Sequence, residues 1–300
     1  MEKKAQLPRS EGLRRKWLET LLKKGFSLDE GHFSRSSGGE SAYLLIQPKA
    51  NSQLTILFHG TGNDQLFTWQ KMIEALLSKG RSVLTFDLDG HGYASSTLLY
   101  RKKFWESAED LRAFLSSKGL SDYPYELVGY SLGALLALEA ASQQTLRPTK
   151  IVLIALPLRI KIGLRFASLE AFSITKRSFF QQWANYGWRE TFPAVGPIRR
   201  KSFPLRIDSD FEGAYPQMVD QLLRDKPPLE LLTKLSQNCL AVFGSRDTLA
   251  RAEDSSLWRN ADKDRGRDKG LEIVVIDRAN HFLLPFQRQT IDAITTWIDT

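Results

Sequence analysis

The feature that most constrains the fold of this 300-residue chain is a repeated alternation of short apolar runs with longer, helix-like segments. The runs are rich in Val, Ile and Leu, which is typical of strands that are buried on both faces of a parallel sheet. Helix-length segments between them indicate strand-helix-strand units. The predicted strands are Ala42–Gln47, Gln53–Phe58, Ser82–Asp87, Tyr125–Val128, Lys150–Ala155, Cys239–Phe243 and Leu271–Ile276.

The segments between these runs are predicted to be helices that cover the sheet. Gly80 and Gly119 follow two of them, at positions where glycine commonly ends a helix. We therefore predict an α/β fold with a mostly parallel sheet flanked by helices. The predicted helices of the core are Leu66–Lys79, Phe104–Lys118, Ala134–Gln144 and Gln287–Asp299.

The strand pattern stops after Lys150–Ala155 and resumes at Cys239–Phe243. The segment between them has no clear strand, is helical in pattern and is rich in Phe, Trp and Tyr. We interpret it as a helical cap inserted into the core after the strand Lys150–Ala155. The predicted organisation is an N-terminal basic helix and lead-in (1–41), a core in two parts (42–157 and 237–300) and the cap (158–236).

The net charge of +8 at pH 7 raises the question of an anionic partner. Basic residues are interleaved with acidic ones along the chain, so we expect no nucleic-acid partner. The segment Gly12–Gly25 is predicted to be an amphipathic helix that packs on its own domain, with peripheral contact to an anionic membrane as an alternative. Its apolar face would carry Leu13, Trp17, Leu18, Leu21 and Leu22.

The remaining composition is that of an ordinary globular protein. The one cysteine, Cys239, cannot form an intrachain disulfide. We expect a cytoplasmic protein, because no signal peptide and no transmembrane-length apolar run are present. No His-Glu-x-x-His motif or clustered ligand spacing indicates a metal, and we expect no cofactor. Nothing in the sequence indicates an oligomeric state.

The strongest catalytic candidate is Ser131, in the sequence Gly129-Tyr-Ser-Leu-Gly133. This pentapeptide lies between a predicted strand and a predicted helix, where a sharp turn would expose the serine hydroxyl. Glycines two residues away on both sides fit a strained turn that brings strand and helix too close together for larger side chains. The pattern predicts a nucleophilic serine.

The general base is found by elimination among four histidines. His32 precedes any recognisable strand, and His59 and His91 lie at the ends of strands that come before Ser131. Both are interpreted as structural residues. His281 follows the last predicted strand, at the edge of the sheet where Ser131 is expected, and is the predicted base.

A carboxylate is needed to orient His281 and to stabilise its charged form. Asp247 is favoured because it closely follows the penultimate strand, in Gly244-Ser-Arg-Asp, and the carboxyl ends of parallel strands share one edge. Asp254, further along the same loop, and Asp277, at the end of the last strand, remain alternatives.

The oxyanion of an acyl-transfer intermediate needs backbone amide donors. One is expected from the residue after the nucleophile and one from the loop after the strand that ends at Phe58. These positions are Leu132 and Thr61.

From about Ala42 to the last residue, the chain resembles the α/β-hydrolase superfamily. The resemblance rests on the order and spacing of five motifs. Within the superfamily, the chain looks like the branch of monoacylglycerol lipases and bacterial carboxylesterases. It departs from that branch in two places: Ala94 stands where members often have serine, and the hydrophilic stretch Arg259–Lys269 is long. The motifs are His59-Gly-Thr-Gly62, Asp87-Leu-Asp-Gly-His-Gly92, Gly129–Gly133, Gly244-Ser-Arg-Asp247 and Asn280-His281.

The resemblance implies cleavage of a carboxylic ester, through an acyl-enzyme, by the triad Ser131, His281 and Asp247. The expected partner is therefore a small acyl ester, with the aromatic cap supplying apolar walls for its acyl chain. Thioester or amide cleavage by the same triad is an alternative, because the pocket decides the substrate. A non-catalytic binding module on the same fold is the competing class, and other triad chemistry, such as a lyase reaction, is a further alternative.

Overall fold

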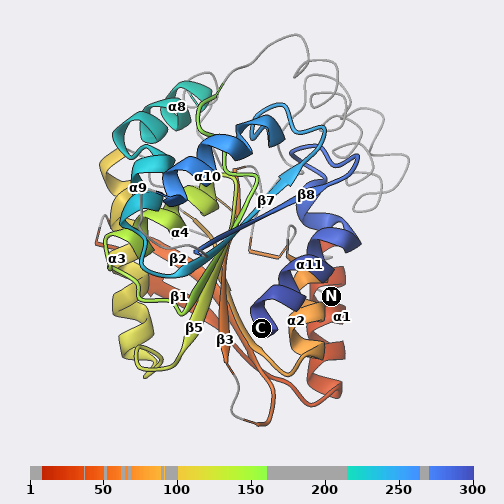
Figure 1. Ribbon diagram of the computed structural model, residues 1–300. Coiled ribbons are helices and arrows are strands. Elements are labelled where there is room, and N and C mark those ends of the chain that lie inside the picture. The colour runs from red at the N-terminus through yellow and green to blue at the C-terminus, as the bar shows by residue number, and fades with distance from the viewer. Residues whose placement is uncertain are drawn as a thin grey trace, which may run out of the picture.

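The computed structural model shows one central sheet with helices on both faces (Figure 1). The residues that it describes are 9–36, 38–50, 53–61, 65–66, 69–88, 91, 101–160, 215–263 and 270–300.

The sheet has eight strands in the order β1-β2-β4-β3-β5-β6-β7-β8. From β4 to β8 in this order all neighbours run parallel. Strand β2 is antiparallel to both of its neighbours, β1 and β4. The prediction of a mostly parallel sheet flanked by helices is confirmed. The strands are β1 (Ser27–Ser34), β2 (Glu40–Gln47), β3 (Leu54–Phe58), β4 (Ser82–Phe86), β5 (Tyr125–Tyr130), β6 (Lys150–Ile154), β7 (Asn238–Gly244) and β8 (Leu271–Ile276).

Strand β1 corrects one sequence-based expectation. His32 was expected to precede any strand, but it lies on β1, opposite Ala42 of β2. The sequence Ser27–Ser34 is polar, and only Phe33 among its side chains is buried. An edge strand of this kind needs few apolar residues, because one of its sides faces no other strand. Its polar composition is why the pattern concealed it.

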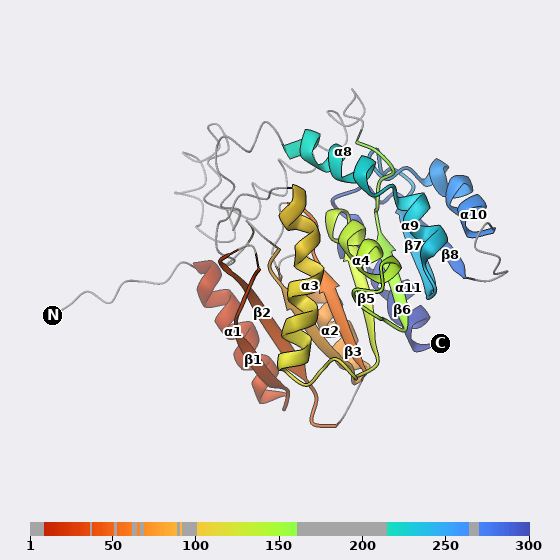
Figure 2. The same cartoon turned by 90° about the vertical axis from the view of Figure 1, so that its left-hand side faces the viewer.

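Helices cover the two faces of the sheet in separate layers (Figures 1 and 2). One layer holds α1 (Arg9–Lys23), α2 (Gln70–Ser78) and α11 (Arg288–Asp299). The other holds α3 (Arg101–Ser117), α4 (Leu132–Ser142), α9 (Pro228–Lys234) and α10 (Ser255–Lys263), with α8 (Tyr215–Asp225) above them. The sequence did not predict α10, which follows β7 and buries Trp258.

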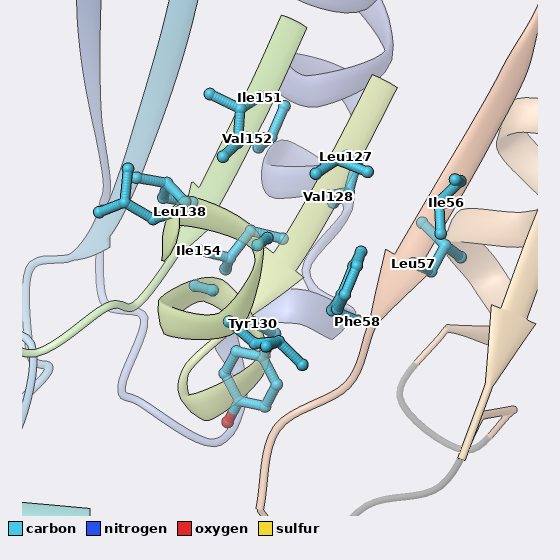
Figure 3. Close-up of a cluster of buried hydrophobic side chains, with 14 of the residues drawn as sticks. Ile56, Leu57, Phe58, Leu127, Val128, Tyr130, Leu138, Ile151, Val152 and Ile154 are labelled. Carbon is cyan, nitrogen blue, oxygen red and sulfur yellow. The ribbon is translucent and has the colours of Figure 1, made fainter. Parts of the chain in front are cut away.

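The core is centred on β3, β5 and β6 and on the helix α4 that packs against them (Figure 3). All residues of α4 are buried, and all those of β3 and β5. The continuous apolar runs of the sequence therefore report burial on both faces, as expected for parallel strands between two helical layers.

Helix α1 packs on the body of its own domain. Leu18 and Leu21 are buried, and the indole Nε1–H of Trp17 donates to the Glu74 carboxylate of α2 at 2.7 Å. Leu22, which was predicted to lie on the same apolar face, is 53% exposed, so the face is covered only in part. Membrane contact through the helix stays a prediction. Among the described residues, no helix has both the length and the apolar character needed to cross a bilayer.

Most of the predicted cap, residues 161–214, lies outside the described residues. Helices α8 and α9 fall within the predicted range, and α9 packs against α4 and α10 of the core. Leu231 and Leu232 of α9 are buried in that contact. The cap and its boundaries stay predictions.

A buried ion cluster lies at the amino ends of β3, β4 and β5, which we call the amino edge of the sheet. Arg81, directly before β4, pairs with Glu126 of β5, and the two side chains are 6% and 2% exposed. The Arg81 guanidinium also donates to Thr55 Oγ1 of β3 at 3.2 Å and lies 3.3 Å from Asp299 of α11. This amino-edge ion cluster ties three strands to the last helix.

Candidate active site

The three residues predicted to form a triad meet at the carboxyl ends of the parallel strands, the carboxyl edge of the sheet. Ser131 follows β5, Asp247 lies beyond β7, and His281 lies beyond β8. His281 Nε2 is 3.0 Å from Ser131 Oγ, and His281 Nδ1 is 2.9 Å from Asp247 Oδ2. Residues that are 150 and 34 positions apart in the chain therefore form one continuous chain of hydrogen bonds.

The backbone at Ser131 is in a strained conformation, with φ of 51° and ψ of −115°. A positive φ is uncommon for a residue with a side chain, and strain of this kind clusters at functional sites. Here it lets the chain turn directly from β5 into α4, with Ser131 only partly buried at the bend. The hydroxyl is thus presented at the rim of the sheet.

The two flanking glycines of the turn leave no room for a side chain. A Cβ on Gly129 would lie 2.5 Å from Ala134 Cα, and one on Gly133 would lie 2.3 Å from the carbonyl oxygen of Phe58. Both distances are far inside van der Waals contact with backbone. The prediction that strand and helix approach too closely for larger residues is confirmed.

The Asp247 carboxylate is completely buried and held on both oxygens. Oδ1 accepts the backbone N–H groups of Leu249 and Ala250 at 2.8 and 2.7 Å, and Oδ2 faces His281 Nδ1. Hydrogen bonds from amide donors stabilise the charged carboxylate after its removal from water. Asp247 is therefore fixed in orientation as well as in position.

The tautomer of His281 follows from its partners. An ionised carboxylate only accepts hydrogen bonds, so Nδ1 must carry the proton that points to Asp247. Nε2 of the neutral ring is then an acceptor, aimed at the Ser131 hydroxyl. This arrangement is suited to removing a proton from the serine.

The loops that carry the acid and the histidine are bonded to each other. The N–H of Ser245 donates to the Ile276 carbonyl, and the N–H of Arg246 to the Ala279 carbonyl, both at 2.9 Å. At Gly244, an added Cβ would lie 2.3 Å from the Ala279 oxygen. The Asp247 loop (244–250) and the His281 loop (277–283) therefore form one unit.

The alternative acids lie elsewhere. The Asp277 side chain is 77% exposed and faces Arg278, and its Oδ1 accepts the Ser245 hydroxyl. Asp254 faces Arg251. The structure brings Asp247, and neither alternative, into contact with His281.

The two predicted oxyanion donors lie on segments that touch. Leu132 is the first residue of α4, where backbone N–H groups have no partner within the helix. Thr61 follows β3 through Gly60, and the turn into α4 packs against the end of that strand through Gly133. The arrangement places both segments beside Ser131.

His59 and His91 form a separate buried pair with ring centroids 5.0 Å apart. His59 Nε2 accepts the Leu88 N–H, and Nδ1 lies 2.9 Å from the Gly60 carbonyl. Burial, reinforced by the neighbouring His91, lowers the pKa of His59 to about 3. His59 is thus neutral and joins the loops after β3 and β4, which agrees with the structural role predicted for it.

Sequence reasoning missed two contacts near the site. The buried Asp87 carboxylate accepts the Gln65 backbone N–H at 2.7 Å, which anchors the loop after β3. The Tyr130 hydroxyl donates to the main-chain carbonyl of His281 at 3.1 Å. An aromatic residue directly before the serine was visible as a signal, whereas nothing marked Gln65.

Among the described residues, no group of three or more His, Cys, Asp or Glu side chains could hold a metal.

Two relatives share sequence with part of the chain. A protein of Haemophilus influenzae, provisionally named 2-succinyl-6-hydroxy-2,4-cyclohexadiene-1-carboxylate synthase, is 31% identical over 180 residues, covering 60% of this chain and 62% of that protein. Esterase EstD of Thermotoga maritima is 26% identical over 239 residues, covering 76% of this chain and 54% of that protein. The chain thus matches less than two thirds of the length of either relative.

Solved structures resemble the chain over nearly its whole length. A bacterial membrane phospholipase A has a TM-score of 0.66 at 17% identity, covering 96% of this chain and 90% of that chain. An esterase of Pyrococcus furiosus has a TM-score of 0.61 at 14% identity, covering 94% and 92%. At these identities the likeness concerns the fold alone.

A family model described as the alpha/beta hydrolase fold matches residues 55–296, from β3 into α11. This range contains all three residues of the hydrogen-bonded chain and most of the protein. The chain therefore belongs to the α/β-hydrolase fold family.

Proposed function

We propose that this protein is a serine hydrolase that cleaves a carboxylic ester through an acyl-enzyme. The observation that carries the proposal is the hydrogen-bonded chain from Ser131 Oγ through His281 to Asp247, at 3.0 and 2.9 Å. Membership of the α/β-hydrolase fold family and similarity to EstD over 76% of the chain support it. The strained conformation of Ser131 supports its role as nucleophile.

In the first half-reaction, Ser131 Oγ attacks the ester carbonyl carbon while its proton moves to His281 Nε2. The carbonyl π electrons become the oxyanion of a tetrahedral intermediate. When this intermediate collapses, the bond to the leaving alcohol breaks and the alcohol oxygen takes the proton from Nε2. Asp247 holds the imidazolium that exists between the two proton transfers.

In the second half-reaction, water attacks the acyl-enzyme and gives a proton to His281 Nε2. Collapse of the second intermediate releases the carboxylic acid, and the proton returns to Ser131 Oγ. The backbone N–H groups of Leu132 and Thr61 would bind the oxyanion in both intermediates, as preorganised donors do in this class of reaction.

The substrate class that we favour is a small, uncharged acyl ester, and the resemblance to monoacylglycerol lipases and carboxylesterases supports it. The aromatic composition of the predicted cap supports an apolar acyl site. We place the reaction in the cytoplasm, which a single buried cysteine supports.

A fluorophosphonate probe tests the proposal directly, because it reacts with an activated serine. The wild-type protein should be labelled, and Ser131→Ala should not. Ser142→Ala is a matched control, since Ser142 is a buried serine of α4 that bonds only within its helix, to the Glu139 carbonyl, among described contacts. Absence of labelling in a folded wild-type protein would refute the enzymatic proposal in favour of a binding module.

A substrate panel then separates the alternatives. p-Nitrophenyl esters of increasing chain length, with matched thioesters and anilides, should show the highest kcat/KM for an ester. A higher kcat/KM for the thioester or anilide of the same acyl group would contradict ester specificity while leaving the serine mechanism intact.

A further inference from the structure

Tyr130, the residue before the proposed nucleophile, contacts both the residue that carries the proposed base and the segment after β3. It is at the carboxyl end of β5, close to Phe58 and Ile154 at the ends of the neighbouring strands (Figure 3). Its side chain is 1% exposed. A fully buried tyrosine usually satisfies its hydroxyl with a specific partner, so that partner is informative.

The partner of the hydroxyl is the main chain of the proposed base. Tyr130 Oη donates to the carbonyl oxygen of His281 at 3.1 Å, and the two rings lie with centroids 5.6 Å apart. The peptide bond that follows Tyr130 leads directly into Ser131. The hydrogen bond therefore fixes the backbone of the base relative to the backbone of the nucleophile.

The other side of the ring contacts the segment after β3. A Cβ on Gly60 would lie 2.7 and 2.8 Å from two ring carbons of Tyr130, so residue 60 must be glycine for the ring to fit. The next residue is Thr61, a proposed oxyanion donor. One side chain thus touches the segment that carries an oxyanion donor and the residue that carries the base.

We propose that Tyr130 is a positioning residue that sets the distance between His281 and Ser131 through its hydroxyl. The inference rests on the proposed function and adds to it. Asp247 fixes the Nδ1 side of the imidazole, but it belongs to the loop unit beyond β7 and β8. The Tyr130 hydrogen bond joins that unit to β5, where the nucleophile is attached.

The chemical consequence concerns turnover more than substrate binding. The proton transfer from Oγ to Nε2 requires an approach of about 3 Å, and displacements of about 1 Å cost up to about 100-fold in rate. The Tyr130 side chain is 1% exposed and so offers almost no surface to a substrate. Loss of the hydroxyl should therefore lower kcat and leave KM nearly unchanged.

Tyr130→Phe tests this, because it removes the hydroxyl and keeps the ring that packs on Gly60. Tyr125→Phe is the matched control. Tyr125 is a buried tyrosine at the opposite end of the same strand, and its hydroxyl accepts the Arg147 backbone N–H at 2.7 Å. Both variants lose one buried hydroxyl bonded to main chain, but only one of these bonds reaches the site.

Three kinds of measurement are compared in the wild type and both variants. Thermal unfolding measures stability, and kcat, KM and the rate of fluorophosphonate labelling measure reactivity. The low-field NMR signal of the proton between His281 Nδ1 and Asp247 reports the geometry of that hydrogen bond. His281→Gln assigns that signal. We expect similar decreases in Tm for the two variants. Tyr130→Phe alone should lower kcat and the labelling rate about tenfold, and should shift or broaden the NMR signal.

Wild-type kcat, labelling rate and proton signal in Tyr130→Phe would overturn the proposal. Equal losses in Tyr130→Phe and Tyr125→Phe would also overturn it, because they would indicate general destabilisation. If the wild type neither hydrolyses esters nor reacts with the probe, the proposed function fails on its own. The NMR comparison, which needs no substrate, would still support or refute the positioning role.

Discussion

The two edges of the same sheet each bury a set of ionisable side chains, but the sets are built differently. At the amino edge, Arg81 and Glu126 form an ion pair with further contacts to Thr55 and Asp299. At the carboxyl edge, the hydrogen-bonded chain from Asp247 ends at Ser131, a partly buried residue in a strained conformation. In the first set the two most buried charges pair with each other, whereas the second set ends at a hydroxyl near the surface.

This difference separates stability from chemistry. A buried ion pair whose members satisfy each other has little to offer a ligand, and disrupting it mainly affects folding. At the carboxyl edge, His281 Nε2 faces the Ser131 hydroxyl, and the backbone of Ser131 is strained. This combination is typical of a reactive site. The contrast predicts that changes at the two edges affect different measurements.

The largest effect is expected for Asp247→Asn at the carboxyl edge. The amide can donate to His281 Nδ1 and so favour the wrong tautomer, which should lower kcat about 10⁴-fold with little change in unfolding free energy. Initial rates on a p-nitrophenyl ester measure this. Asp277→Asn and Asp254→Asn serve as controls and should keep near wild-type kcat. A severe loss in Asp277→Asn instead would show that the acid is assigned incorrectly.

At the amino edge, Glu126→Gln should mainly reduce stability. It leaves the buried Arg81 guanidinium without its buried carboxylate partner, and such a loss costs about 3 kcal/mol or more of unfolding free energy. Urea unfolding at pH 7 measures the change, while kcat per folded molecule at 15 °C should stay near that of the wild type. The double variant Arg81→Met/Glu126→Leu should recover much of the stability. A large decrease in kcat for Glu126→Gln would erase the distinction between the two edges.

At the carboxyl edge itself, pH should separate the role of His281 from that of His59. Activity should decrease on the acid side of neutrality, as His281 takes up the proton that stops it acting as a base. His59 cannot cause this limb, because its pKa is about 3 in the folded protein. A flat profile of kcat/KM from pH 5 to pH 8 would contradict the role of His281.

His59 should instead affect stability. Its folded pKa lies below the unfolded value, so the unfolded state takes up the proton first and stability decreases as pH falls from about 6.5 towards 3. At pH 5 the loss from His59 should be about 2 kcal/mol. Urea unfolding at pH 7.5 and 5 measures it, and His59→Gln, whose side chain can both donate and accept, should show a shallower dependence. An unchanged slope would contradict the neutral, buried state of His59.

The smallest effect is expected at the outer member of the amino-edge ion cluster. Asp299 is 35% exposed and lies 3.3 Å from Arg81, so solvent screens the interaction. Asp299→Asn should change the unfolding free energy by less than about 1 kcal/mol and leave kcat unaffected. A loss as large as that of Glu126→Gln would mean that the cluster acts as one indivisible unit.

The elements that were predicted best from the sequence are those that are buried on all sides, because almost all of their residues are apolar. Strand β3 and helix α4 are buried all round, so their composition alone revealed them. Strand β1 was missed because an edge strand tolerates polar residues, and α10 was missed because its surface is mostly polar around one buried tryptophan. Edge elements carry a weaker signal than central ones.

In the site, too, some features could be predicted from the sequence and others depend on contacts between distant segments. Ser131 and His281 were predicted from chain order and a glycine pattern, and the structure brings them together. Asp247 was favoured over Asp277 because it follows the penultimate strand, but the close contact of Gly244 with Ala279, which joins the two loops, has no local sequence signal. The Tyr130 contact with His281 likewise depends on how distant loops meet.

The 150-residue separation between Ser131 and His281 has a consequence for how the protein matures. A nascent chain that has emerged only as far as α4 already contains the turn around Ser131, but neither β7 nor β8, and therefore no base and no acid. Pairings between distant segments form late, after the entropy of closing a long loop has been overcome. Covalent labelling of Ser131 during refolding would thus follow the docking of the last two strands, and the reactive serine would stay inert until the whole sheet is assembled.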